Sequence, residues 1–270
     1  MKMHSIYYGL SNDETKKIFA RKSNIFRAVV GTVGLICMCL VIYFTYYEKL
    51  AEIFLTFAVF LCFHICFKKY NRKLTIELQN ILLLDCDPVK LHYQLEQMNY
   101  NSKRGRKALN FQFANIGRFA KEYFEEGENA LKQVEVKTLS QLPLFKALQG
   151  SYALRRNDIE EYFRITDEIF KLPKPTTKRE KESYEMICAT AQRERLFWEG
   201  KYEEALRLWL EEYKGSNDTS LTNVATVKRI ADCKWELGEK EKALELYQFV
   251  VDNGGTTYLV EQAREKIKSE

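Results

Sequence analysis

The sequence predicts an all-α protein in which a two-helix transmembrane hairpin precedes a superhelical solenoid of α-α units. Two apolar stretches lie close together near the N-terminus, at residues 28–44 and 53–67, and only a few polar residues separate them. The rest of the chain is highly charged, contains little glycine or proline, and lacks the period-two alternation that strands produce. Chain breakers recur at intervals that leave room for helices of about 12–18 residues.

The first apolar stretch is suited to crossing a bilayer, which takes about 20 mostly apolar residues for a core of about 30 Å. Extended to Tyr47, it reaches that length with Arg27 at one end and tyrosines at the other. The second stretch reaches it only from Leu50, which places Glu52 inside the far interface, so a re-entrant or interfacial helix is the alternative there. A buried hairpin of a soluble core is the other alternative, although such helices keep a polar stripe that these lack.

Basic residues determine the expected orientation of the hairpin. Both outer flanks are basic and the connector between the stretches is slightly acidic, so the positive-inside rule predicts that both termini are cytoplasmic. Anionic lipid headgroups are the expected partner of the basic cluster that follows the second stretch. This cluster consists of Lys68, Lys69, Arg72 and Lys73. The composition and the lack of targeting signals favour an integral protein of a bacterial cell membrane.

Four segments are expected along the chain. Residues 1–25 form a cytoplasmic arm, in which the capping box Ser11–Glu14 starts a short amphipathic helix. Residues 26–67 form the hairpin, 68–104 a basic membrane-proximal linker with helices, and 105–270 a helical repeat domain that ends in a capping helix. The excess of basic residues, 42 against 37 acidic ones, lies in the membrane flanks. No nucleic-acid partner is therefore expected, and the basic run at 103–107 is assigned to lipid contact or solvation rather than to RNA.

No motif for catalysis or cofactor binding is present. The chain has no glycine-rich phosphate loop, no HExxH and no GxSxG. Its seven cysteines include no CxxC pair, which favours a reducing compartment. In the spacing Cys62-x-His64-x-Cys66 the histidine projects away from the face that the cysteines share, so packing is expected there rather than a metal site. His92, with a cysteine and an aspartate close in sequence, is the one place for a catalytic pair, but nothing predicts a pocket. We therefore expect no enzyme, no cofactor and no small-molecule substrate.

Internal repeats occur in the C-terminal part. Residues 198–209 (WEGKYEEALRLW) and 236–247 (ELGEKEKALELY) match well. Each segment begins at the end of a helical run and contains a turn glycine followed by the start of an amphipathic helix. Weaker copies lie at 156–163, where Asn157 takes the turn position and Tyr162 replaces a small residue, and at 122–127. The pattern resembles the tetratricopeptide repeat family over about residues 105–267.

The resemblance implies stacked helix pairs and a concave groove, lined by the first helix of each pair, that binds a peptide or partner helix. Transferred by register, the candidate groove residues are Gln112, Phe119, Ala147, Thr190, Glu194, Lys228, Asp232 and Trp235. Packing is the alternative role for Phe119 and Trp235. The clamp asparagine of the branch that binds chaperone tails is missing, so an acidic tail of that type is not expected.

The expected function is a membrane-anchored interaction scaffold that binds a partner protein or peptide through this groove at the cytoplasmic membrane face. The alternative is a structural or assembly subunit of a membrane complex that contacts its partners through the transmembrane helices. Gly31 and Gly34 would supply small surfaces for such packing.

Overall fold

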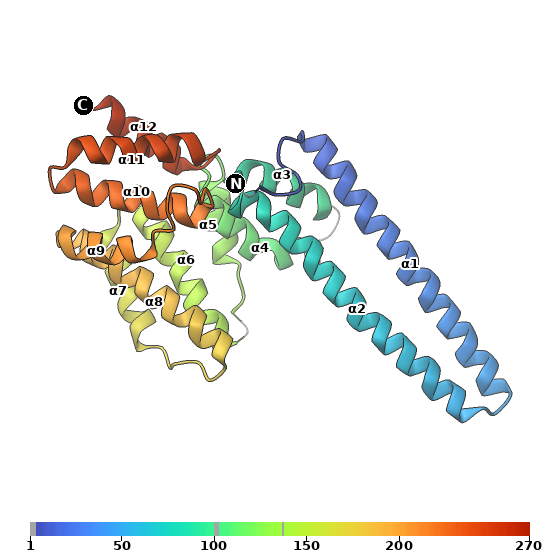
Figure 1. The fold of residues 1–270 in the computed structure, drawn as a ribbon. Coiled ribbons are helices and arrows are strands. Elements are labelled where there is room, and N and C mark those ends of the chain that lie inside the picture. The colour runs from blue at the N-terminus through green and yellow to red at the C-terminus, as the bar shows by residue number, and fades with distance from the viewer. Residues whose placement is uncertain (1–3, 100–102, 137) are drawn as a thin grey trace. The chain divides into compact units, whose positions relative to one another are not determined.

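The computed structural model describes residues 4–99, 103–136 and 138–270. These residues form twelve α-helices and one short 3₁₀ helix, and no strand occurs among them, which confirms the all-α prediction (Figure 1). The chain divides into two compact units. One comprises residues 5–80, and the other comprises His4 and the described residues from 81 to 270.

The N-terminal unit is built from two long helices, α1 (Asn12–Tyr46) and α2 (Leu50–Leu83), of which α2 reaches into the second unit. Both are long and apolar enough to cross a membrane. Only 6% of the most apolar stretch of each helix is buried. A core helix of a soluble protein would be mostly buried, so these exposed apolar surfaces favour a lipid environment.

The boundaries of these helices differ from the predicted segments. The capping box is present, since the amide of Ser11 donates to Oε2 of Glu14 at 2.8 Å and the amide of Glu14 donates to the Ser11 hydroxyl at 3.3 Å. The helix it starts does not end within the arm but continues through the apolar stretch to Tyr46, because no glycine or proline occurs between Ser11 and Gly31. In the same way, α2 continues through the basic cluster, so the chain has no break after residue 67.

Side-chain contacts between α1 and α2 occur from about the middle of each helix towards the end away from the connector. The ring of Phe26 stacks on those of Phe67 and Tyr70, with centroid distances of 5.3 and 4.0 Å. The Lys22 ammonium lies 2.9 Å from the Glu77 carboxylate. These contacts join the two helices into a hairpin.

The C-terminal unit contains the remaining helices. They are α3 (Pro88–Asn99), α4 (Lys103–Gly117), α5 (Phe124–Lys132), η1 (Leu139–Gln141), α6 (Leu142–Arg155), α7 (Ile159–Lys171), α8 (Lys178–Trp198), α9 (Tyr202–Glu212), α10 (Leu221–Glu236), α11 (Lys240–Asn253) and α12 (Tyr258–Lys268). Consecutive helices pack as pairs: α4 with α5, α6 with α7, α8 with α9, and α10 with α11 (Figure 1). The pairs contact one another through α6–α8 and α9–α10, and α12 packs on α11 as a last helix.

The turns within the pairs use the residues that the repeat pattern identifies. Gly200, Gly238 and Asn157 have φ values of 77°, 80° and 59°, which is the left-handed region that glycine and asparagine tolerate. Ala205 and Ala243, five residues after the two glycines, are completely buried. Their small side chains let the two helices of each pair approach closely.

The pair α6–α7 reaches close packing differently, because Tyr162 occupies the position of the small residue. A Cβ atom added to Gly150 of α6 would lie 3.3 Å from the Tyr162 ring. The missing side chain of Gly150 therefore provides the space that the tyrosine fills, and the Tyr162 hydroxyl donates to the carbonyl of Ala191 at 3.3 Å. The small and large partners have exchanged helices, and the close approach is retained.

Candidate partner-binding groove

A cavity of about 400 Å³ runs along the first helices of the pairs. Asn115 of α4, Ala147 of α6, Thr190 of α8 and Thr226 of α10 all line it, and α7, α9 and α12 contribute further side chains. We call this cavity the groove. Its wall is mainly apolar, with a few charged residues from α8, α10, the C-terminal end of α9 and the segment that follows α4.

Five of the eight residues transferred from the repeat register line the groove: Phe119, Ala147, Thr190, Glu194 and Lys228. The other three, Gln112, Asp232 and Trp235, do not. Trp235 packs against Tyr247 and lies within 5.1 Å of the Lys240 and Lys266 ammonium groups, so its role in this structure is packing. Phe119 lines the groove, and the Arg118 guanidinium covers its ring at 4.5 Å.

A buried charge network connects α8, α10 and α11. Nε of Arg229 donates to Oε1 of Glu194 at 2.6 Å, and its Nη1 lies 3.1 Å from Oδ2 of Asp232. The same Oδ2 accepts from the Lys228 ammonium at 2.8 Å, while Oδ1 accepts from the Tyr247 hydroxyl at 2.9 Å. We refer to these five residues as the charge network. It contains two cations and two anions, so it is neutral as a whole.

Burial and mutual attraction set the protonation of the charge network. Burial by itself would raise the pKa of Asp232, but Lys228 and Arg229 outweigh it and hold that pKa below its ordinary value. Burial would likewise lower the pKa of Arg229, yet Glu194 and Asp232 raise it. For Lys228 burial dominates and the pKa is lowered despite Asp232. Asp232 and Arg229 therefore stay ionised at neutral pH, and each is the counterion that keeps the other charged.

Three buried polar atoms at the groove have no hydrogen-bond partner among the described residues. They are Nε of Arg118, Nε1 of Trp209 and Oε2 of Glu194. Burial lowers the pKa of Arg118 to about 10, which shows how poorly its charge is compensated. An unsatisfied buried polar group costs about 1–3 kcal/mol.

Some groove residues were missed at the level of sequence, above all Arg118, Arg193, Trp209 and Tyr258. Arg193 is buried over the Trp209 ring at 4.7 Å and pairs with Glu212 at 3.0 Å. The sequence carries one usable signal, since cations within otherwise apolar helix faces indicate a buried pair. It contains no indication of which carboxylate from another helix supplies the partner.

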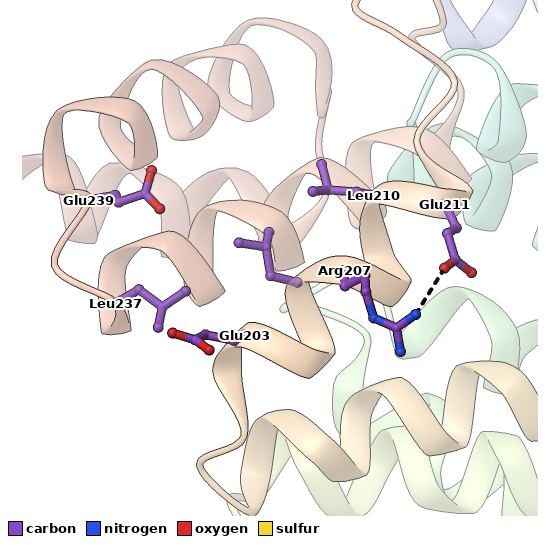
Figure 2. Close-up of a pocket in the computed structure, with 7 residues that line it drawn as sticks. Glu203, Arg207, Leu210, Glu211, Leu237 and Glu239 are labelled. Carbon is purple, nitrogen blue, oxygen red and sulfur yellow. Dashed lines mark ion pairs between the residues drawn. The ribbon is translucent and has the colours of Figure 1, made fainter.

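A second depression lies between α9 and the turn that precedes α11 (Figure 2). Its charged groups are solvated, as the Arg207–Glu211 pair illustrates with a separation of 3.7 Å and side chains 71% and 64% exposed. An exposed pair of this kind contributes little binding energy. The groove is therefore the better candidate for a binding site.

The predicted lipid-contact residues Lys68, Lys69, Arg72 and Lys73 are all exposed on α2. None of the four has an ion-pair partner among the described residues. Their charges are thus available to a membrane surface.

Comparisons with known proteins do not assign the chain to a family. No protein-family model matches it, and no curated protein or solved structure is significantly similar to it.

Proposed function

We propose that this protein is a membrane-anchored interaction scaffold that binds a peptide segment of a partner protein in the groove at the cytoplasmic face of a bacterial cell membrane. The observation that carries the proposal is the groove itself, a mainly apolar cavity whose lining residues include Arg118, Trp209 and Glu194, each with a buried polar atom that has no partner among the described residues. Such sites bury a mainly apolar ligand and orient it through a few polar contacts.

A peptide is the ligand class that fits this combination best. Its main chain offers carbonyl acceptors and amide donors at regular intervals, so one extended segment can satisfy two donors and one acceptor. The paired helices with left-handed turn residues support the proposal, since the groove runs along the first helices of these pairs.

The hairpin adds local concentration to this recognition. Two apolar helices would hold the groove at the membrane surface, so a partner that is also membrane-bound meets it at a raised effective concentration. The exposed basic cluster on α2 would contact anionic headgroups at about 1 kcal/mol per residue near the surface.

Site-specific photocrosslinking in cells tests groove binding. A photoreactive amino acid at Thr190, exposed and lining the groove, should give an adduct of one defined mass, whereas the same group at Glu245, exposed on α11, should not. Met186→Glu adds a charge to an exposed groove residue and should reduce the Thr190 adduct several-fold without unfolding the protein. Equal adducts at both positions, or an adduct that Met186→Glu leaves unchanged, would refute groove binding.

The second candidate is a structural or assembly subunit that acts through its apolar helices. It is favoured by open space at Gly31 and Gly34, where an added Cβ would meet no atom within 4 Å. Small residues with free space above them let another helix approach. Replacing residues 26–67 by an unrelated hairpin separates the candidates, because groove binding survives this exchange and span-mediated assembly does not.

A further inference from the structure

His92, on α3, does not line the groove, and its imidazole is held in one orientation. Its ring stacks on Tyr123 with a centroid distance of 3.7 Å and an interplanar angle of 6°, and the Phe113 ring lies at 5.2 Å. The His92 side chain is only 3% exposed. These ring contacts restrict rotation of the imidazole about its side-chain torsions.

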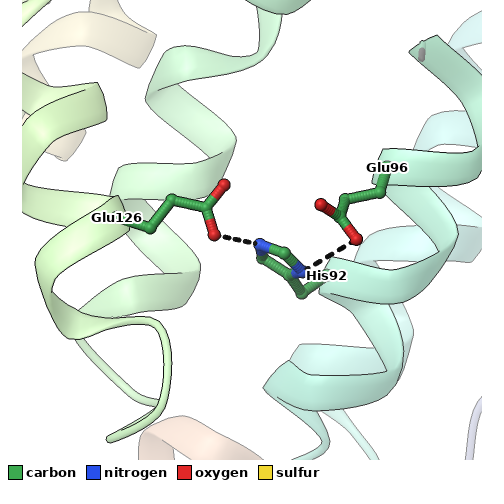
Figure 3. Close-up of side chains that lie close together, drawn as sticks. All are labelled: His92, Glu96 and Glu126. Carbon is green, nitrogen blue, oxygen red and sulfur yellow. Dashed lines mark hydrogen bonds and ion pairs between the residues drawn. The ribbon is translucent and has the colours of Figure 1, made fainter.

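The two ring nitrogens face two different carboxylates (Figure 3). Nε2 lies 2.8 Å from Oε2 of Glu126 on α5, which is a hydrogen bond. Because a carboxylate can only accept, the proton of the neutral ring belongs on Nε2. Nδ1 is then a bare lone pair, and it lies 3.8 Å from Oε2 of Glu96, too far for a hydrogen bond. Nδ1 has no other hydrogen-bond partner among the described residues.

Two Lewis bases that face each other at this distance can share a cation. An ion with ligand bonds of about 2.0–2.2 Å brings two donor atoms to within about 4.4 Å of each other, so 3.8 Å admits one. The spacing of four residues on one helix keeps both donors on the same face of α3. Hydrogen bonding of the other ring nitrogen to a carboxylate is the arrangement that usually orients a metal-binding histidine and makes it more basic.

We propose that Nδ1 of His92 and the carboxylate of Glu96 bind a divalent transition-metal ion such as Zn²⁺, and that Glu126 positions the imidazole for this. The Glu96 side chain is 37% exposed, so the ion is reached from solvent and water completes its coordination. Imidazole with carboxylate suits Zn²⁺ and Co²⁺ rather than the softer Cu(I). The bound ion would fix α3 to α5 through Glu126. This site is independent of the groove and of what the groove binds.

Titration of the full chain in lipid nanodiscs with Co²⁺ alone tests the site. Co²⁺ is chosen because its absorption distinguishes imidazole and carboxylate ligands from the thiolates of the seven cysteines. The wild type should bind one ion more than His92→Gln and than Glu96→Gln. Glu126→Ala should keep the stoichiometry but weaken binding about 10–100-fold. Glu126→Gln retains an acceptor for Nε2 and should weaken it less.

The matched control is His4→Gln, which changes the other described histidine beside a carboxylate, at 3.5 Å from Asp85. It should bind Co²⁺ as the wild type does. Glu96→Gln alters a partly exposed side chain, so it decides the question even where His92→Gln fails to fold. Equal stoichiometry and affinity in the wild type and Glu96→Gln would overturn the proposal and would mean that only a proton occupies the space. A loss in His4→Gln as large as that in Glu96→Gln would also overturn it.

Discussion

Asp232→Asn is the sharpest test of the charge network. The Asp232 carboxylate is 6% exposed and receives three contacts within 3.1 Å, from Lys228, Arg229 and Tyr247. Asparagine keeps the size and one acceptor oxygen but removes the charge. The variant therefore probes electrostatics with little change in packing.

The expected loss follows from the charge balance. The wild-type network is neutral, and without the Asp232 charge it carries one uncompensated buried cation. Breaking a buried pair in this way costs about 3–5 kcal/mol. Arg229 keeps Glu194 at 2.6 Å and the Lys228 side chain is 11% exposed, so the lower half of that range is expected. At about 2–4 °C per kcal/mol for a unit of this size, a loss of about 3–4 kcal/mol should lower the melting temperature by about 6–16 °C.

Tryptophan fluorescence during urea unfolding in nanodiscs measures the loss in the free energy of unfolding. The chain has three tryptophans, Trp198, Trp209 and Trp235, and all lie in the unit that contains the network. The hairpin in its lipid therefore contributes no tryptophan signal. The assay reports on the unit formed by residues 81–270 alone.

The control is an exposed pair of the same chemistry. Glu211→Gln removes the partner of Arg207 at the surface and should cost less than about 0.5 kcal/mol. Adding Lys228→Met to Asp232→Asn removes the uncompensated cation and should recover part of the loss. The reasoning is refuted if Asp232→Asn costs no more than Glu211→Gln, since the network would then be as well solvated as a surface pair.

Three further outcomes are expected. Burial raises the pKa of Asp232 but the neighbouring cations lower it more, so the pKa in the folded state lies below the unfolded value of about 3.9. The ionised carboxylate therefore stabilises the fold fully above a pH of about 3.9, and this stabilisation is lost as pH falls through the folded pKa. Acid titration followed by tryptophan fluorescence should show a shallower loss of stability in Asp232→Asn than in the wild type. Gly117→Ala should destabilise by about 1–3 kcal/mol in urea unfolding, because its Cβ would meet the Tyr152 hydroxyl at 2.5 Å and the Tyr123 carbonyl at 2.6 Å, whereas Gly31→Ala on open helix surface should be neutral or stabilising. Protease added to sealed right-side-out cells should spare the region after residue 74, and the same protease should cleave it in inside-out vesicles; cleavage from outside would reverse the predicted orientation.

Much of the fold follows from local sequence signals. The capping box at Ser11 and the proline at Pro88 mark helix starts that the structure contains, and Gly200 and Gly238 mark turns whose φ values only glycine adopts easily. The helix that starts after Ser11 is longer than the sequence predicts, because the amphipathic pattern changes to an apolar one without a residue that stops a helix. A change of environment along a helix is not a change of secondary structure.

Long-range pairing is what local patterns do not encode. The exchange of small and large residues between Gly150 and Tyr162 joins two helices, so neither position explains the other by itself. The same holds for the groove, where Glu194 of α8 meets Arg229 of α10 across the boundary between helix pairs. Register transfer located five groove residues, including Phe119 just after the end of α4, but it did not identify the neighbouring Arg118.

Stability alone does not account for charges at the groove wall. Well-packed apolar residues of similar volume would serve the same fold equally well or better, since desolvation offsets most of the attraction in a buried pair. Apolar residues would not supply the carboxylate of Glu194. Its Oε1 accepts from Arg229, and its Oε2 has no hydrogen-bond partner among the described residues. An acceptor fixed in place before the ligand arrives loses little entropy on binding. The proposed peptide function gives the network a role that packing does not, because the network holds the carboxylate of Glu194, a groove-lining residue, in a fixed orientation.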